Sequence, residues 1–177
     1  MKIIKKEDFK ESKWAGGVTS EVFIYPKEAD VSKKNFDFRI STASCELEKS
    51  AYTSYDDFYR FICPLDNKME ISVDDYKFNL SPFEILFFDG KAKTYSSGDL
   101  RDFNLIYKKG LEGDMEALNI CNYKTYFKDL GLIFNYDSDL KINGEEFPKF
   151  SCLELENEEV EIKGQGKIII CRIKNKK

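Results

Sequence analysis

The amino-acid sequence predicts an all-β protein, and three observations carry this prediction. Runs of about four to nine residues, rich in aromatic and β-branched types, follow one another along nearly the whole chain. Turn-forming stretches such as 65–68 (LDNK) and 88–91 (FDGK) separate these runs. Apolar residues nowhere keep the 3.6-residue spacing of an amphipathic helix over several turns.

The expected strands fall into two sets. The first set precedes residue 110 and covers residues 19–26, 36–44, 58–65, 68–73, 76–80, 83–88 and 102–109. The second set covers residues 115–120, 123–127, 131–136, 139–142, 150–155, 158–163 and 167–174. Only the charged segment 5–13 and the segment 54–58 give a hint of helix.

The composition is that of a globular protein without a polyanionic partner. With 42% hydrophobic residues, the 177-residue chain can bury a sizeable core. Its 28 lysines and arginines do not exceed its 32 acids, so the net charge of −4 predicts no binding to nucleic acid or to a membrane surface. Because the apolar runs are too short to span a bilayer, we expect a cytoplasmic protein. The five cysteines are odd in number and widely separated, so we expect them to be reduced.

The chain contains no histidine, and this absence removes several classes of site. Histidine is the commonest metal ligand and the commonest general base near neutral pH. Serine–histidine and cysteine–histidine catalysis are therefore excluded, and a metal would have to rely on carboxylates or on cysteines that lack C-x-x-C spacing. We expect neither a bound metal nor a cofactor.

An internal similarity predicts a duplicated architecture. With a shift of 71 residues, the segment 61–76 aligns with 132–147 without a gap, and apolar and aspartate-bearing positions coincide. Two unrelated hairpins could align in the same way. We favour duplication, with a first domain over residues 1–110 and a smaller second domain over residues 111–177.

Four ordered motifs in the first half resemble those of the HutD/Ves family. They are Trp14–Glu21 (WAGGVTSE), Phe36–Ser41 (FDFRIS), the arginine strand around Arg60 (DFYRFICPL), and the segment 100–110 (LRDFNLIYKKG). The chain departs from the family pattern in a shorter glycine segment, in Phe38 where tryptophan is usual, and in the sequence YDDFYR before the arginine strand.

This resemblance implies a duplicated cupin, that is, a bicupin built from RmlC-like jelly rolls. It also implies a link to histidine utilisation and to binding of a pathway intermediate such as formylglutamate or a relative. The family has no firmly associated enzymatic activity. Through the tryptophan and T-x-E positions, the resemblance adds Trp14 and Thr19 to the candidate ligand-binding residues.

Strand alternation separates a polar face from an apolar one. It places Arg39 and Ser41 opposite Phe38 and Ile40 in one strand, and in another strand it places Asp102 and Asn104 on one shared face. An arginine inside a small barrel needs a carboxylate, since an unpaired buried charge costs several kcal/mol. Glu21 or Asp102 could supply it, which would make Arg39 a structural ion-pair residue.

Arg60 has a different setting. It lies among aromatic residues, and the nearby acids Asp56 and Asp57 belong to the preceding turn. An arginine without a strong partner of its own protein is a candidate for a ligand carboxylate, which its planar guanidinium can hold through two hydrogen bonds. The alternative is a solvated surface arginine. Trp14 could likewise cover the cavity or simply anchor the core.

Three functions fit these features. The first is a metal-free protein that binds a small carboxylate through Arg60, Arg39, Glu21, Asp102 and Asn104. The second is a metal-independent enzyme for a small acid, with Glu21, Asp102 or Tyr107 as acid or base. The third is a protein-interaction module that uses exposed aromatic residues. A homodimer is compatible with all three.

Overall fold

The computed structural model describes residues 1–47 and 49–175, and the chain divides into two compact units. The first unit is Lys10–Gly110, and the second unit combines Met1–Phe9 with the chain from Leu111 onward. Apart from two short 3-10 turns, η1 (Lys6–Asp8) and η2 (Val31–Lys33), the regular elements described are β-strands. The all-β prediction is confirmed.

The first unit contains a six-stranded antiparallel sheet that carries the polar residues of interest. Its order is β2 (Lys10–Trp14), β3 (Gly17–Tyr25), β4 (Phe38–Cys45), β11 (Leu100–Lys108), β6 (Phe58–Pro64) and β9 (Leu86–Asp89). A bulge between Glu21 and Phe23 interrupts the pairing of β3 with β4. The extra residue shifts the alternation of β3 by one position. Odd-numbered residues before the bulge and even-numbered residues after it therefore point to the same face of the sheet.

A four-stranded sheet completes the first unit, in the order β5 (Ser50–Ala51), β10 (Thr94–Ser97), β7 (Met69–Val73) and β8 (Tyr76–Leu80). Buried residues of both sheets share one apolar cluster, which includes Ile62 of β6, Leu100 of β11, and Met69 and Ile71 of β7. The two sheets therefore pack face to face around this cluster, as in a jelly roll.

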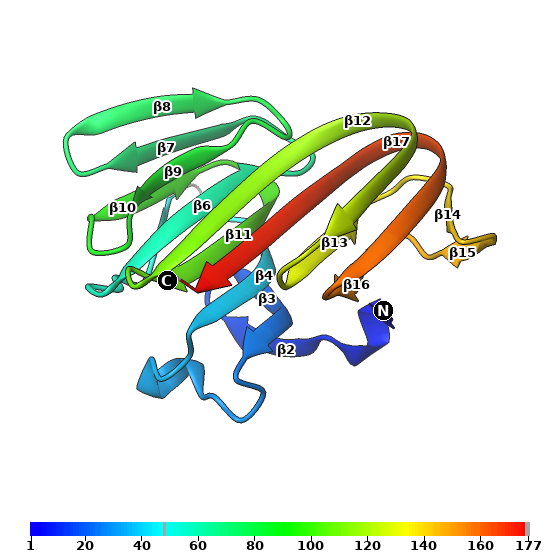
Figure 1. The fold of residues 1–177 in the computed structure, drawn as a ribbon. Helices are drawn as coiled ribbons and strands as arrows, with labels where there is room; N and C mark the ends of the chain where they lie inside the picture. The colour runs from blue at the N-terminus through cyan, green and yellow to red at the C-terminus, as the bar shows by residue number, and fades with distance from the viewer. Residues whose placement is uncertain (48, 176–177) are drawn as a thin grey trace. The chain divides into compact units, whose positions relative to one another are not determined.

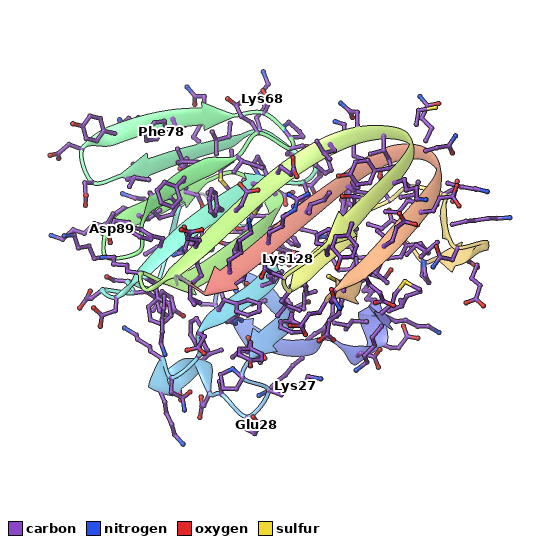
Figure 2. All side chains as sticks on the ribbon, viewed as in Figure 1. Lys27, Glu28, Lys68, Phe78, Asp89 and Lys128 are labelled. Carbon is purple, nitrogen blue, oxygen red and sulfur yellow. The ribbon has the colours of Figure 1, made fainter. Side chains whose placement is uncertain are left out.

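The second unit contains a seven-stranded sheet. It includes β1 (Lys2–Ile4), β16 (Ser151–Leu155), β13 (Gly131–Asn135), β17 (Glu158–Asn175), β14 (Leu140–Ile142) and β15 (Glu145–Phe147) in that order, and β12 (Leu111–Phe127) pairs with β17. The long, bent strands β12 and β17 run side by side (Figure 1). Side chains project from both faces of the strands (Figure 2), and the apolar ones form a core that includes Ile133, Leu153 and Ile170.

Several predicted boundaries differ from the structure. The runs 115–120 and 123–127 are one strand, β12, whose register with β17 shifts between Cys121 and Tyr123 without ending the strand. The runs 158–163 and 167–174 are likewise one strand, β17, although Gly164 and Gly166 lie between them. Gly166 serves close packing instead of a turn, since a Cβ there would lie 2.1 Å from the Ser138 hydroxyl oxygen.

The helical hint at 5–13 is wrong beyond its first turn. Only Lys6–Asp8 forms a 3-10 turn, and the charged residues from Lys10 belong to β2, an exposed strand with no apolar stripe. The segment 54–58 contains a turn and no helix. The strands β1, β2, β5, β10 and β15 were not predicted, because they are short or polar and lack a run of apolar residues.

The structure assigns the first nine residues differently from the sequence analysis, which began the first domain at residue 1. Strand β1 pairs with β16, so Met1–Phe9 groups with the second unit. The aligned segments 61–76 and 132–147 both run from a strand into a hairpin, β7–β8 and β14–β15. Duplication itself remains a prediction, since β6 and β7 lie in different sheets whereas β13 and β14 both pair with β17.

The five cysteines are in the reduced state, and four of them are buried, whereas Cys121 on β12 is exposed. Within the described part of the chain, no helix is long and apolar enough to cross a membrane.

Candidate functional site

A polar pocket of about 290 Å³ lies on one face of the six-stranded sheet. The alternation of the strands explains its composition. In β4, Arg39 and Ser41 line the pocket, whereas Phe38 and Ile40 are buried on the other face. In β11, Asp102, Asn104 and Ile106 line it.

The register of the sheet sets these side chains in rows. Arg39 of β4 lies opposite Ile106 of β11, which lies opposite Arg60 of β6. In the next row, Ser41 lies opposite Asn104. The two guanidinium groups therefore belong to one row of the same face, with a single strand between them.

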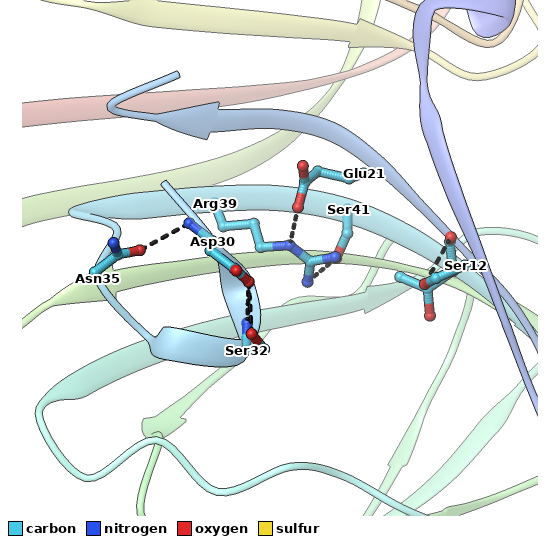
Figure 3. A network of polar contacts seen from close by, with 8 residues as sticks. Ser12, Glu21, Asp30, Ser32, Asn35, Arg39 and Ser41 are labelled. Carbon is cyan, nitrogen blue, oxygen red and sulfur yellow. Dashed lines mark hydrogen bonds and ion pairs between the residues drawn. The ribbon is translucent and has the colours of Figure 1, made fainter. Parts of the chain in front are cut away.

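Arg39 is held within the protein. Its Nε donates to Glu21 Oε2 at 2.8 Å, and its Nη1 donates to Ser41 Oγ at 3.3 Å (Figure 3). Both side chains of the ion pair are largely buried, with exposed fractions of 10% for Arg39 and 13% for Glu21. The expected ion pair is thus present, and Glu21 rather than Asp102 supplies its carboxylate.

Arg60 has a weaker set of partners. Nη2 donates to Asn104 Oδ1 at 2.8 Å, and Nη1 donates to the Thr53 carbonyl at 3.4 Å. The guanidinium lies 5.0 Å from the ring centroid of Tyr52 and 5.5 Å from that of Phe88. Among the described residues, no carboxylate forms an ion pair with it, and its buried Nε has no hydrogen-bond partner. Only 4% of the residue is exposed, so the alternative of a solvated surface arginine is wrong.

Burial lowers the pKa of the Arg60 guanidinium from its usual value, while the charge of Asp102 acts in the opposite direction. An arginine nevertheless stays cationic at neutral pH, because its intrinsic pKa is so high. The pocket therefore contains a desolvated positive charge.

Asp102 is the negative group of the pocket. The Tyr52 hydroxyl donates a hydrogen bond to Asp102 Oδ2 at 3.0 Å, and Asn104 Nδ2 donates one to Asp102 Oδ1. Burial raises the pKa of Asp102 to about 6, although these hydrogen bonds and the Arg60 charge lower it. Asp102 therefore changes charge just below neutral pH. Burial also raises the pKa of Tyr52 well above its usual value, so its hydroxyl remains a neutral donor.

Trp14 and Thr19 line the pocket from the hairpin of β2 and β3. The hairpin loop is glycine-containing because a Cβ on Gly16 would lie 2.2 Å from the Trp14 ring, and one on Gly17 would lie 1.8 Å from the Ser44 carbonyl oxygen. Trp14 is 38% exposed and so is not a core anchor. Ser12 Oγ is within 3.5 Å of the Thr19 carbonyl oxygen (Figure 3).

The structure thus brings six of the seven predicted ligand-binding residues to one pocket; these are Trp14, Thr19, Arg39, Arg60, Asp102 and Asn104. Glu21 stands behind Arg39 as its ion-pair partner. Tyr107, named as a possible acid or base, is not among the lining residues and packs against Tyr59 and Phe61.

Sequence reasoning missed the segment that covers one side of the pocket. Ser50, Tyr52, Thr53 and Tyr55 line it from β5 and the loop that follows. Tyr52 also contacts Ser96 Oγ at 3.1 Å. This loop has no periodic pattern, and only its density of hydroxyl-bearing residues (SAYTSY) could have drawn attention to it.

The arrangement can hold an anion and exchange a proton with it. Arg60 lines the pocket with a guanidinium that no carboxylate holds, and Asp102 can donate or accept a proton near its pKa. Within the described residues, no group of three histidine, cysteine, aspartate or glutamate side chains is placed to hold a metal ion.

Proteins of known structure share the fold of this chain over nearly its whole length. No curated protein sequence matches. HutD from Pseudomonas fluorescens SBW25 is similar in structure at 20% identity, with 99% of each chain covered and a TM-score of 0.84. A conserved protein of unknown function from Pseudomonas aeruginosa PAO1 is similar at 18% identity, with 99% of each chain covered and a TM-score of 0.83.

A cupin 2 conserved barrel domain protein from Leptotrichia buccalis is also similar, at 13% identity, with 98% of this chain and 96% of that chain covered and a TM-score of 0.63. At these identities the likeness shows the fold, which is a cupin-like barrel fold. The sequence pattern of the HutD family matches residues 6–171. The chain therefore belongs to the HutD family.

Proposed function

We propose that this protein binds a small carboxylate in the pocket of the first unit, with Arg60 as the residue that contacts the carboxylate. The observation that carries the proposal is the Arg60 guanidinium, which lines the pocket and donates only to the neutral oxygens of Asn104 and Thr53. A buried cation without a carboxylate partner costs free energy, and a ligand carboxylate would offset part of that cost.

The contrast with Arg39 supports this choice of residue. Both arginines are buried on the same face, but Arg39 already donates to Glu21. A ligand carboxylate would have to compete with that carboxylate at Arg39, whereas at Arg60 it would compete only with the neutral oxygens of Asn104 and Thr53. Charge-assisted hydrogen bonds are roughly twice as strong as neutral ones, so a carboxylate would be favoured there.

The rest of the pocket favours a ligand that also bears polar groups. Asp102, Tyr52 and Thr19 surround the arginine with acceptors and hydroxyl groups. Membership of the HutD family supports an intermediate of histidine degradation, such as a formylglutamate-like acid, as the ligand class. We propose that the protein senses or sequesters this ligand in the cytoplasm without a metal or cofactor.

The test is a thermal-shift screen of histidine-degradation intermediates and other small mono- and dicarboxylates, followed by titration calorimetry with the acid that stabilises the protein most. Arg60→Ala should weaken binding by roughly ten- to a hundredfold, and Arg60→Lys, which keeps the charge but loses the planar guanidinium, should weaken it less.

Arg172→Ala in the second unit is the matched control. Arg172 is also an arginine that contacts an aromatic ring, but it is paired with Asp114 and Glu116, and its loss should leave binding unchanged. If folded Arg60→Ala binds as tightly as the wild type, the pocket assignment is wrong, and Arg39 is the next candidate.

An enzyme acting on a small acid is the second candidate, because the raised pKa of Asp102 suits a general acid or base. Steady product formation that is lost in Asp102→Asn, with ligand binding retained, would favour it. Binding without turnover would favour the first candidate. Elemental analysis that finds one equivalent of iron, zinc or manganese, needed for binding, would contradict the metal-free proposal.

A further inference from the structure

Strand β2 leaves one edge of the six-stranded sheet open. It is the first strand in the order of that sheet, and among the described residues only β3 pairs with it. All five of its residues, Lys10 to Trp14, are exposed. An open edge presents unpaired backbone N–H and C=O groups that another strand can bind.

The phase of the β2–β3 hairpin determines which backbone groups point outward. The loop contains only Ala15 and Gly16, and Trp14 pairs with Gly17. Residues that flank a two-residue loop exchange both hydrogen bonds with each other, and this pattern recurs at every second residue. Lys10, Ser12 and Trp14 therefore direct their backbone groups toward β3, and Glu11 and Lys13 direct theirs to the open edge.

The charges on this edge are self-complementary. The sequence of β2 is Lys-Glu-Ser-Lys-Trp, so Glu11 and Lys13 lie symmetrically about Ser12. We propose that β2 is a dimer interface, in which β2 of a second copy pairs antiparallel with it about a two-fold axis at Ser12. Glu11 then lies opposite the partner's Lys13, and Lys13 lies opposite the partner's Glu11. Both pairs join the residues whose backbone groups face outward, so each can exchange two hydrogen bonds.

The edge strand β8 of the four-stranded sheet is a less suitable interface. Its two-residue loop after Val73 leaves Lys77 and Asn79 with outward-facing backbone groups, by the same reasoning. Self-pairing there would bring Lys77 opposite the partner's Asn79, so no opposite charges would meet, although the two copies of Phe78, labelled in Figure 2, would form an aromatic contact. Strand β2 differs from β8 in its charge complementarity, which fixes one register and one partner, a second copy of this chain.

The β2 dimer would also add a residue to the pocket. Lys10, Ser12 and Trp14 share one face of β2, and Trp14 lines the pocket. In the proposed register, Trp14 lies opposite the partner's Lys10. Each pocket would then have a lysine of the other copy beside its tryptophan, which adds a cation at the mouth and allows a cation–π contact.

A single pair of five-residue strands is a small interface compared with those of stable dimers. The dimer should therefore be weak and should depend on concentration and on ionic strength. Sedimentation equilibrium of the full-length protein over a wide concentration range, at low and high salt, is the suitable measurement. We expect reversible association to twice the mass of one chain, weakened by salt.

Charge reversal provides the decisive variants. Glu11→Lys alone puts lysine opposite lysine in both pairs, and Lys13→Glu alone puts glutamate opposite glutamate. Each single variant should raise the dimer dissociation constant by about tenfold or more. The double variant Glu11→Lys/Lys13→Glu restores opposite charges and should restore the dimer. An equimolar mixture of the two single variants should form heterodimers.

The single tryptophan supplies an independent readout, because Trp14 is the only one in the chain. Its emission should change on dilution of the wild type and should not change on dilution of Glu11→Lys. A monomer at about 1 mM protein, where even an association of only about 4 kcal/mol would be half complete, would overturn the proposal. A dimer that is equally strong in both single variants would overturn the assignment to β2.

Discussion

The two units bury different kinds of strand. In the second unit, Ile168, Ile169 and Ile170 of β17 are consecutive and fully buried, so both faces of that strand are apolar. In the first unit, β4 alternates, with Phe38 and Ile40 on one face and polar residues on the other. Among the described residues, the buried charged groups Arg39, Arg60 and Asp102 are all in the first unit.

The two kinds of strand contribute differently to the free energy of folding. A strand that is apolar on both faces gains free energy from every side chain that it buries. A buried face with two guanidinium groups and a carboxylate loses free energy to desolvation, and the loss is offset only in part by hydrogen bonds. We infer that the second unit supports the fold and that the first unit retains a costly polar face for the proposed ligand.

The largest expected effect is on the apolar side of this comparison. Ile170→Ala removes a fully buried side chain from the core of the second unit and should lower the free energy of unfolding by about 2–5 kcal/mol. Chemical denaturation measures this change. If ligand affinity of the folded variant falls as well, the separation between the units is wrong.

The next effect concerns the pH dependence of stability. Asp102 has a pKa of about 6 in the folded protein and an ordinary pKa of 3.8, so the folded state binds its proton more tightly. Its contribution to the free energy of unfolding is therefore least favourable above pH 6, and improves as the pH falls toward 4. The full change is about 3 kcal/mol.

Asp102→Asn should remove this component, and denaturation at several pH values between 4 and 8 compares the two proteins. Identical pH profiles for the wild type and the variant would contradict the raised pKa.

In the wild type, a carboxylate ligand should also bind more tightly at pH 5.5 than at pH 7.5, because protonation of Asp102 removes a repulsive charge next to Arg60.

A smaller effect is expected at the Arg39 end of the pocket. Glu21→Gln removes the charge that pairs with Arg39 but keeps a hydrogen-bond acceptor, so the free energy of unfolding should fall by about 1–3 kcal/mol. Arg39 would then be available to a ligand, and carboxylate affinity should stay the same or rise. A loss of affinity as large as that of Arg60→Ala would show that Glu21 contacts the ligand itself.

The smallest effect is expected at the surface of the second unit. Lys124 and Glu159 form an ion pair at 2.9 Å across β12 and β17, and both side chains are about 60% exposed. Solvent and salt screen such pairs, so Lys124→Ala should change neither the melting temperature nor ligand affinity measurably. A clear loss of stability would mean that charge, and not only apolar burial, supports the second unit.

The sequence by itself determined most strands of the first unit and their faces, but not the short or polar strands β2, β5 and β10. Alternation around Arg39 and around Asp102 is a local property, because successive side chains of a strand point to opposite faces whatever the strand pairs with. The absence of histidine and the lack of a sustained helical stripe were equally visible in the sequence. These features predicted the fold class, and they predicted that most of the pocket residues share a face with another pocket residue of the same strand.

Only the tertiary structure decided which residues are partners. Glu21 and Arg39 meet across 18 residues of sequence, Arg60 and Asn104 across 44, and Tyr52 and Asp102 across 50. Such contacts depend on strand register and on the bulge in β3, since a shift of one residue would exchange the two faces of a strand. The choice of Glu21 over Asp102 as the partner of Arg39, and the unsatisfied Nε of Arg60, follow from that register and from nothing local in the chain.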